Sequence, residues 1–260
     1  MSSSNSWETQ ITDVKPNNIL VRGYRLADLV NKVSFTEVIY LVIKGELPDE
    51  NAKKVLDAVL VAAIDHGGSP PSTLATRTVV STGAQYNAAL AAGILSINKY
   101  HGGAIEDCAK IIEQLVKKAQ QGESNIYDLA KELIAEFREK GKRLPGFGHR
   151  MHTDDPRVKV LKSIAQDTGF AGSYFEAGVA IEGSLTEVLG KSLPMNVDGM
   201  MAIMLCELDF PLELANMFFI TARVPGLISH IYEEDKLQKK MRKIDPVNYE
   251  YTGVSERDLY

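Results

Sequence analysis

The sequence predicts an all-α protein. Apolar residues recur at helical spacing in one segment after another, for example at Val55, Leu56, Val59, Leu60 and Ala63. Start and stop signals bracket such segments: Ser34 with Glu37 fits a capping box, and Gly45 with Pro48 ends the helix that follows it. No stretch shows a convincing strand pattern, and no repeat or low-complexity linker interrupts the series.

The expected helical segments follow one another along the whole chain. They lie at the end of 21–30, over 35–44, from 49 to 64, within 70–83 and 85–99, from 104 to about 120, and over 125–140, 156–167, 173–190 and 198–208. A long last helix begins at about Pro211, and Arg223-Val-Pro-Gly226 predicts a kink in it. The residues from Asp245 on are expected to form a loosely structured tail, which in an oligomer could lie on a neighbour.

Composition narrows the class of protein. The chain has 260 residues, 45% hydrophobic and 24% charged, which is ordinary for a globular protein with one large core. The net charge of -5, with basic residues scattered apart from 236–243, excludes nucleic acid as a partner. Two cysteines without metal spacing favour a reducing compartment. We read no secretory signal at the N-terminus and no apolar run long enough to span a membrane, so the predicted location is the cytoplasm.

The segment from Arg143 to Arg157 is the richest in candidate functional groups. It holds two histidines, three arginines and a Pro-Gly-x-Gly turn between two helical stretches. Asp154 or Asp155 can cap the next helix, with Pro156 at its first position. Arg157 then falls in the first turn, where the helix dipole disfavours a cation. A residue that breaks a local rule is a candidate for function, although a surface loop is the plain alternative.

Four polar residues are expected near helix ends, where the helix dipole can shift their protonation. His66 follows a helix, where the dipole favours an imidazolium suited to an anion, and His101 precedes one, where it favours a neutral hydrogen-bond donor. His149 lies in the glycine-flanked loop, and Asp198 precedes a helix. The plain alternatives are a turn residue for each histidine and an N-cap for Asp198. No metal spacing, dinucleotide fingerprint or nucleophile elbow is present, and together these groups suit an anionic carbonyl substrate.

Several short motifs resemble those of the citrate synthase superfamily, in the same order. The segment Phe35–Pro48 resembles a helix-turn of that family, and Arg22-Gly-Tyr24 resembles the tripeptide that precedes it. The other matching motifs are Asp65-His66, His101-Gly102, Pro145-Gly-Phe-Gly-His149, Asp155-Pro-Arg157, Asn196-Val-Asp198 and Arg223. The match covers nearly the whole chain from Val21 to about Lys243, and six motifs in order with compatible gaps are highly specific.

The resemblance implies a helical fold with a large and a small domain. The large domain would comprise residues 1–110 and 206–260 with the tail, and the small domain residues 111–205. It also implies an obligate homodimer, or a higher homo-oligomer, with the site between the domains. The substrates would be a coenzyme A thioester and a di- or tricarboxylate, with no permanently bound cofactor and no metal.

The resemblance also assigns roles to single residues. Asp198 looks like the family's carbon acid/base, His101 like the donor that stabilises the enol of the thioester, and His149 like the residue bonded to the oxaloacetate carbonyl. The carboxylate-binding residues would be His66, Arg150, Arg157, Arg223 and, from the partner subunit, Arg242, with Lys243 as the alternative. The coenzyme A contacts would be Pro145, Gly146, Phe147, Gly148 and Asn196.

Departures from the family pattern separate the possible activities. Full-length citrate synthases are longer, mostly at the N-terminus. Arg150 directly after His149 is more similar to the lyase module of ATP-citrate lyase and to free-standing citryl-CoA lyases, whereas His101 points back toward synthases. We therefore expect cleavage of citryl-CoA to acetyl-CoA and oxaloacetate, with a separate citryl-CoA synthetase as a conceivable partner. The alternatives are a compact citrate or 2-methylcitrate synthase, and a non-catalytic regulatory subunit of the same fold.

Overall fold

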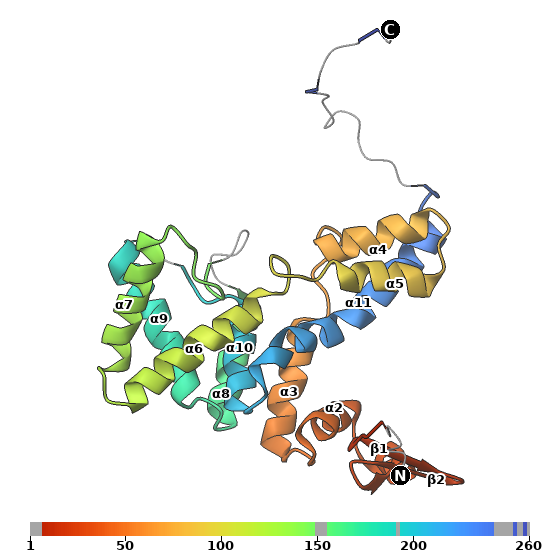
Figure 1. Cartoon of the computed structure of the whole chain (residues 1–260), viewed down its shortest axis with the longest axis horizontal. Helices are drawn as coiled ribbons and strands as arrows, with labels where there is room; N and C mark the ends of the chain where they lie inside the picture. The colour runs from red at the N-terminus through yellow and green to blue at the C-terminus, as the bar shows by residue number, and fades with distance from the viewer. Residues whose placement is uncertain (1–6, 149–154, 191–192, 242–251, 254–256, 259–260) are drawn as a thin grey trace, which may run out of the picture. The chain divides into compact units, whose positions relative to one another are not determined.

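The computed structural model describes residues 7–148, 155–190, 193–241, 252–253 and 257–258. Helices dominate these residues, which confirms the predicted all-α class (Figure 1). The chain divides into two compact units, one of residues 1–65 and 97–224 and the other of residues 66–96 and 225–260. This division differs from the large and small domains expected from the sequence, whose boundaries stay a prediction.

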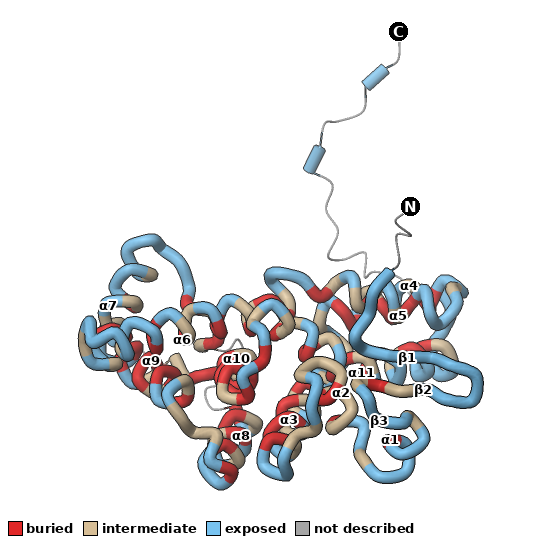
Figure 2. The backbone as a smooth tube through the Cα atoms, turned by 60° about the horizontal axis from the view of Figure 1, so that its bottom comes forward, coloured by how far each residue is buried: buried red, intermediate tan, exposed pale blue. Residues whose placement is uncertain are grey.

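The first unit begins with a small antiparallel sheet, so the expectation that no strands occur is wrong. Strands β1 (Thr12–Lys15), β2 (Asn18–Val21) and β3 (Tyr24–Arg25) form a meander in the order β1-β2-β3, with Asp13 opposite Leu20. These strands are mostly exposed (Figure 2). They have at most four residues each, which is too short for an alternating pattern to stand out.

The next three helices lie close to where the sequence predicts them, and the predicted ends of α2 are confirmed, whereas α3 ends two residues before the expected residue 64. Helix α1 covers Leu26–Lys32, α2 covers Phe35–Lys44 and α3 covers Glu50–Ala62. The Ser34–Glu37 capping box is present at the start of α2, and Gly45 ends it in the left-handed conformation with φ 88°. Asp49 caps α3 through a 2.7 Å bond from the backbone N–H of Ala52.

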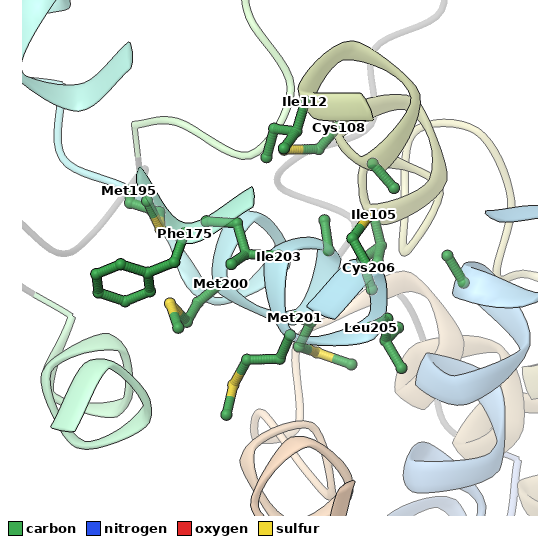
Figure 3. Close-up of a cluster of buried hydrophobic side chains, with 14 of the residues drawn as sticks. Ile105, Cys108, Ile112, Phe175, Met195, Met200, Met201, Ile203, Leu205 and Cys206 are labelled. Atoms are coloured by element: carbon green, nitrogen blue, oxygen red, sulfur yellow. The ribbon is translucent and has the colours of Figure 1, made fainter. Parts of the chain in front are cut away.

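Helix α10 (Val197–Glu207) is the centre of the first unit. Packed against it are α3, α6 (Ala104–Gln120), α8 (Pro156–Asp167) and α9 (Ser173–Leu189), and α7 (Ile126–Glu139) covers α6 and α9. Figure 2 shows α10 buried along its length, and Figure 3 shows its Met200, Met201, Ile203 and Cys206 packed among side chains of α6 and α9. A helix that is apolar on all sides belongs in a core.

The second unit consists of α4 (Pro71–Ser81), α5 (Tyr86–Leu95) and the last part of α11 (Ala215–Leu237), which follows the short 3-10 helix η1 (Leu212–Leu214). Helices α4 and α5 pack closely because Gly93 faces Thr76; a Cβ at Gly93 would lie 2.0 Å from the Thr76 hydroxyl. The Arg77 guanidinium bonds Glu234 at 2.7 Å inside this unit.

The segment Leu212–Leu237 contradicts the expectation that no apolar run could span a membrane, as far as length and composition go. Its mean hydropathy is 1.2 over the most apolar window, of which 44% is buried in protein. The core helix of a soluble protein passes the same test. The segment also carries Arg223 and Glu234, both 2% exposed and both held by protein partners.

Truncating a methionine of α10 should destabilise the protein strongly. Met201 is fully buried, so Met201→Ala removes apolar contacts and leaves a cavity, at a cost of about 2–5 kcal/mol in the free energy of unfolding. Met217→Ala is the matched control, because the Met217 side chain on α11 is 48% exposed. Chemical unfolding should separate the two variants; equal losses would contradict the central place of α10 in the core.

Candidate active site

The carboxyl end of α3 holds two of the arginines predicted to bind substrate. The Arg157 side chain donates from Nη1 to the carbonyl oxygen of Ala62 at 3.3 Å, and Arg223 donates from Nε to that of Ala63 at 2.9 Å. The last carbonyls of a helix lack intrahelical partners and carry the negative end of its dipole. They therefore bring two cations together, from α8 and from α11.

Asp155 fixes the orientation of Arg157. Its carboxylate accepts from Nε at 3.0 Å and from Nη2 at 2.7 Å, and it caps α8 by accepting from the backbone N–H of Arg157 at 3.0 Å. Asp155 is 3% exposed, and the expected cap is thereby confirmed. The positive end of the helix dipole at the start of α8 disfavours a cation, and the ion pair with Asp155 offsets this unfavourable interaction of Arg157. A guanidinium has five N–H groups, and two of them remain after these side-chain bonds and the bond to Ala62.

Arg223 is the more deeply buried of the two arginines. It is 2% exposed, its guanidinium lies 4.7 Å over the ring of Phe219, and its Nη1 has no hydrogen-bond partner among the residues that the structure describes. Burial lowers the pKa of Arg223, an effect that the negative charge of Asp65 opposes. An unsatisfied buried donor costs about 1–3 kcal/mol, which a bound carboxylate would recover.

Asp198 is not the N-cap of α10, which was the structural alternative to a role in catalysis. Asn196 caps α10 by accepting from the backbone N–H of Gly199 at 3.1 Å, and Asp198 is the second residue of the helix. Burial raises the pKa of the Asp198 carboxyl; the charges of Arg157 and Arg223 work against this shift and that of Asp155 adds to it. Asp198 and both arginines therefore share one electrostatic environment.

The turn from Pro145 to Gly148 is joined to the start of α10. The Asn196 side chain donates to the carbonyl of Gly148 at 2.8 Å, and the backbone N–H of Asn196 donates to that of Gly146 at 3.0 Å. Gly146 has φ 84°, and a Cβ at Gly199 would lie 2.3 Å from the Gly146 oxygen. Glycine at both positions lets the two backbones touch, which brings the residues predicted to contact coenzyme A together.

A pocket of about 920 Å³ opens beside this turn, within the first unit. Its wall is mostly apolar, with Phe147 and Gly148 of the turn and leucines of α9 and of the segment before Met195. Its basic residues are Arg138, Lys142 and Arg143. An apolar hollow beside cations can take a ligand with an apolar arm and phosphate groups.

His101 lies in a tight turn before α6, as predicted. Its backbone N–H and carbonyl pair with Asn98 at 2.8 and 2.9 Å, and α6 begins at Ala104 after the cap Gly103. The imidazole meets the ring of Phe219 edge to face, with centroids 6.0 Å apart and an interplanar angle of 83°. His101 and Arg223 thus contact the same aromatic ring.

The helix-end argument for His66 is wrong. Helix α3 ends at Ala62 with Ala63 as its cap, and not at the glycines after His66. His66 is exposed and three residues beyond the cap, where the dipole has faded. Its carboxylate-binding role stays a prediction. His149, Arg150, Arg242 and Lys243 lie outside the described residues, as does most of the tail expected from Asp245 on.

Sequence patterns do not predict three contacts of the site. Asp155 is predicted as a helix cap and as part of the Asp155-Pro-Arg157 motif, and neither signal predicts its side-chain pair with Arg157. Phe219 precedes Arg223 by four residues, the spacing at which side chains on a helix meet. Gly199 follows Asp198 directly and had no signal of its own. Among the residues with described positions, no cluster of His, Cys, Asp and Glu suits a metal ion.

The chain belongs to the citrate synthase family. The family model for the citrate synthase C-terminal domain matches residues 1–54 and 48–244, which confirms the resemblance seen in the sequence motifs. Among curated proteins, putative citrate synthase 2 of Mycobacterium tuberculosis is 31% identical over 206 residues, covering 76% of this chain and 52% of that protein. The chain thus spans about half the length of the curated relatives it matches.

Solved structures match the chain more completely. The citryl-CoA lyase from Hydrogenobacter thermophilus is 39% identical, with a TM-score of 0.87 and 97% of both chains covered. The ATP citrate lyase from Methanothrix soehngenii, solved with citrate and coenzyme A, is 24% identical, with a TM-score of 0.85 over 98% of this chain and 43% of that one. The second likeness shows the fold alone.

The raised pKa of Asp198 predicts that its ionisable carboxyl lowers the free energy of unfolding near neutral pH. Between the ordinary aspartate pKa of about 3.9 and the raised value, the native state binds more protons than the unfolded state, so stability falls as pH rises through this window. Asp198→Asn should therefore raise the melting temperature at pH 7, and the gain should vanish as pH falls toward 4. Glu176→Gln, in the first turn of α9, is the control and should show no such gain. A lower melting temperature for Asp198→Asn at pH 7 would contradict the assignment.

Proposed function

We propose that the protein is a citryl-CoA lyase, which cleaves citryl-CoA to acetyl-CoA and oxaloacetate. The observation that carries this proposal is the end-to-end match to the citryl-CoA lyase of Hydrogenobacter thermophilus, at 39% identity over 97% of both chains. The grouping of Asp198 with Arg157 and Arg223 supports it, because cleavage of a carboxylate-rich thioester needs an acid beside fixed cations.

The reaction breaks the bond between the hydroxyl-bearing carbon of the citryl group and the methylene next to the thioester. His149, helped by Arg150, takes the hydroxyl proton as the oxaloacetate carbonyl forms. The bonding electrons pass to the thioester, whose enolate oxygen accepts a hydrogen bond from His101. Asp198 then delivers a proton to the methylene carbon, which gives acetyl-CoA.

The environment of Asp198 suits the lyase direction. A proton donor must be protonated before the carbon–carbon bond breaks, and burial raises the pKa of this carboxyl toward that state. A neutral acid also avoids placing a second negative charge beside the developing enolate. The cations Arg157 and Arg223 limit the shift, so that the carboxylate left after proton transfer is stabilised as well.

The substrate carboxylates would be held by Arg157 and Arg223, with His66 and, from a second subunit, Arg242. Arg157 is already neutralised by Asp155, and two of its N–H groups remain for a carboxylate. Arg223 brings a buried charge and an unsatisfied Nη1. A planar guanidinium can bind a carboxylate through two parallel hydrogen bonds, so fixed arginines provide orientation as well as charge.

Coenzyme A would bind along the Pro145–Gly148 turn and in the pocket beside it. The apolar wall suits the pantetheine arm, and Arg138, Lys142 and Arg143 suit the phosphates. The turn is bonded to Asn196, two residues before Asp198, so the thioester end of the ligand would approach the acid. Coenzyme A acts here as part of the substrate, with no resident cofactor.

Two alternatives share the family fold. A compact citrate or 2-methylcitrate synthase would form the same carbon–carbon bond and also hydrolyse the thioester; the 31% identity to putative citrate synthase 2 favours it. A non-catalytic regulatory subunit would bind the ligands without turnover. The presence of His101, His149 and Asp198 in one chain speaks against the second alternative.

Synthetic citryl-CoA distinguishes these functions. The purified protein should release oxaloacetate, measured with malate dehydrogenase and NADH, without releasing free thiol, and Asp198→Asn should slow this cleavage by about 100- to 10,000-fold. With acetyl-CoA and oxaloacetate supplied, thiol release at enzymatic rates would contradict the lyase and support the synthase. Binding of coenzyme A by calorimetry without turnover of either substrate would support the regulatory subunit.

We also propose that the protein acts in the cytoplasm as a homodimer or a higher homo-oligomer. Exposed apolar side chains on the second unit support the oligomer: Tyr86 of α5 and Ile228, Tyr232 and Leu237 of α11 are 43–75% exposed, and they line a hollow of about 690 Å³. Soluble proteins seldom leave so much apolar surface together. The free thiols Cys108 and Cys206 suit a reducing compartment. A separate citryl-CoA synthetase would supply the substrate.

Charge placed on this surface should break the oligomer. Ile228→Glu together with Tyr232→Glu puts two carboxylates where apolar side chains would be covered, so the sedimentation coefficient should fall to that of a monomer. Val160→Glu, on the exposed side of α8 in the first unit, is the control and should leave the assembly intact. A wild-type protein that sediments as a monomer at micromolar concentration would contradict the proposal.

A further inference from the structure

One buried aromatic ring contacts two residues of the candidate active site. Phe219 on α11 is 5% exposed. The guanidinium carbon of Arg223 lies 4.7 Å from the centroid of its ring, and the imidazole of His101 meets the ring at 83° with centroids 6.0 Å apart. The two polar side chains come from distant parts of the chain, and both contact this ring.

The two contacts use an aromatic ring in ways that an aliphatic side chain cannot reproduce. A ring carries negative potential on its face and positive potential at its edge, so it attracts a guanidinium placed over the face. The same quadrupole favours a perpendicular arrangement with a second aromatic ring, as His101 adopts. The contact with His101 is directional in angle as well as in distance, and the contact with Arg223 places the guanidinium over the face of the ring.

The backbone beside His101 also rests on this ring. Gly102 has φ 80°, and a Cβ built there would lie 2.8 Å from Cδ1 and 2.9 Å from Cε1 of Phe219. The residue must therefore be glycine if the turn is to approach the ring this closely. Phe219, together with Ile97, whose Cγ2 would lie 2.7 Å from the same Cβ, therefore packs against the backbone turn that carries His101 as well as against its side chain.

Phe219 provides a second contact that holds the Arg223 guanidinium, beside the bond to Ala63. The Nε of Arg223 is bonded to the carbonyl of Ala63, which fixes one edge of the guanidinium, while Nη1 has no hydrogen-bond partner among the described residues. The face of the Phe219 ring covers the guanidinium, whose central carbon lies 4.7 Å from the ring centroid. A carboxylate must then approach the unpaired end in the plane of the guanidinium, because its N–H groups point within that plane.

We infer that Phe219 is a positioning residue for the proposed reaction, aligning both His101 toward the thioester oxygen and Arg223 toward a substrate carboxylate. This inference rests on the proposed function. Through Arg223, Phe219 would affect binding of the keto-acid half of the substrate. Through His101, the same ring would affect stabilisation of the enolate half. Substitution of Phe219 should therefore weaken carboxylate binding and slow the chemical step together.

The neighbouring Phe218 provides a matched control. It lies on the same helix, is 2% exposed, and packs its ring against Phe210 at a centroid distance of 4.6 Å, within the apolar core. Phe218→Leu and Phe219→Leu remove the same atoms from equally buried positions, so both should lose thermal stability to a similar extent. Only the second removes contacts with His101 and Arg223.

The test compares these variants in citryl-CoA cleavage and in oxaloacetate binding by calorimetry. Phe219→Leu should lower kcat and weaken oxaloacetate binding, each about 10-fold or more, whereas Phe218→Leu should change both less than about 3-fold. Phe219→Tyr keeps the ring and should restore most of the activity. Equal effects of the two leucine variants would overturn the inference, because Phe219 would then be a core residue only.

A double-mutant comparison isolates the effect that passes through His101. In a His101→Ala background, Phe219→Leu should lower kcat by less than about 3-fold, since the imidazole that it aligns is gone. A full 10-fold loss in that background would contradict this arm of the inference. If the wild-type protein itself fails to cleave citryl-CoA, the proposed lyase function fails, while the oxaloacetate titrations still test the alignment of Arg223.

Discussion

The end of helix α3 is the constraint on which the candidate site depends. Its final carbonyl groups hold Arg157 and Arg223, which come from α8 and α11 and would otherwise repel each other. Asp155 neutralises one of the two cations, and the other keeps an unsatisfied donor in the protein interior. Both arginines act on Asp198, whose pKa their positive charges lower against the effect of burial. This effect follows from the arrangement, because one helix end fixes where the two cations lie.

Sequence reasoning recovered the elements whose signals are local. The capping box of α2, the cap and proline at the start of α8, and the turn before α6 each depend on residues a few positions apart. It failed where the deciding contact joins distant segments. Helix α3 stops before His66 and its glycines, and the three short strands gain their stability from pairing that four-residue patterns do not reveal.

The same distinction applies to the site. Motif order identified Asp198, His101, Arg157 and Arg223 as candidates, and their family was confirmed by the comparisons. It gave no sign that Asn196 would take over the cap of α10 or that Phe219 would contact both His101 and Arg223. These relations depend on which helix faces meet in space, and one sequence without its fold does not determine them.

The contact between Gly146 and Gly199 has a consequence for protein engineering. The two backbones are in direct contact, with no side chain between them, and a hydrogen bond joins them. The Pro145–Gly148 turn and the first turn of α10 should therefore move together. If the turn binds the acyl carrier as proposed, remodelling it for a different carrier would therefore displace Asp198 as well. In the proposed lyase, changes of carrier specificity are better sought in the part of the pocket wall formed by α7, which packs on α6 and α9, whereas α9 itself packs on the helix that carries Asp198.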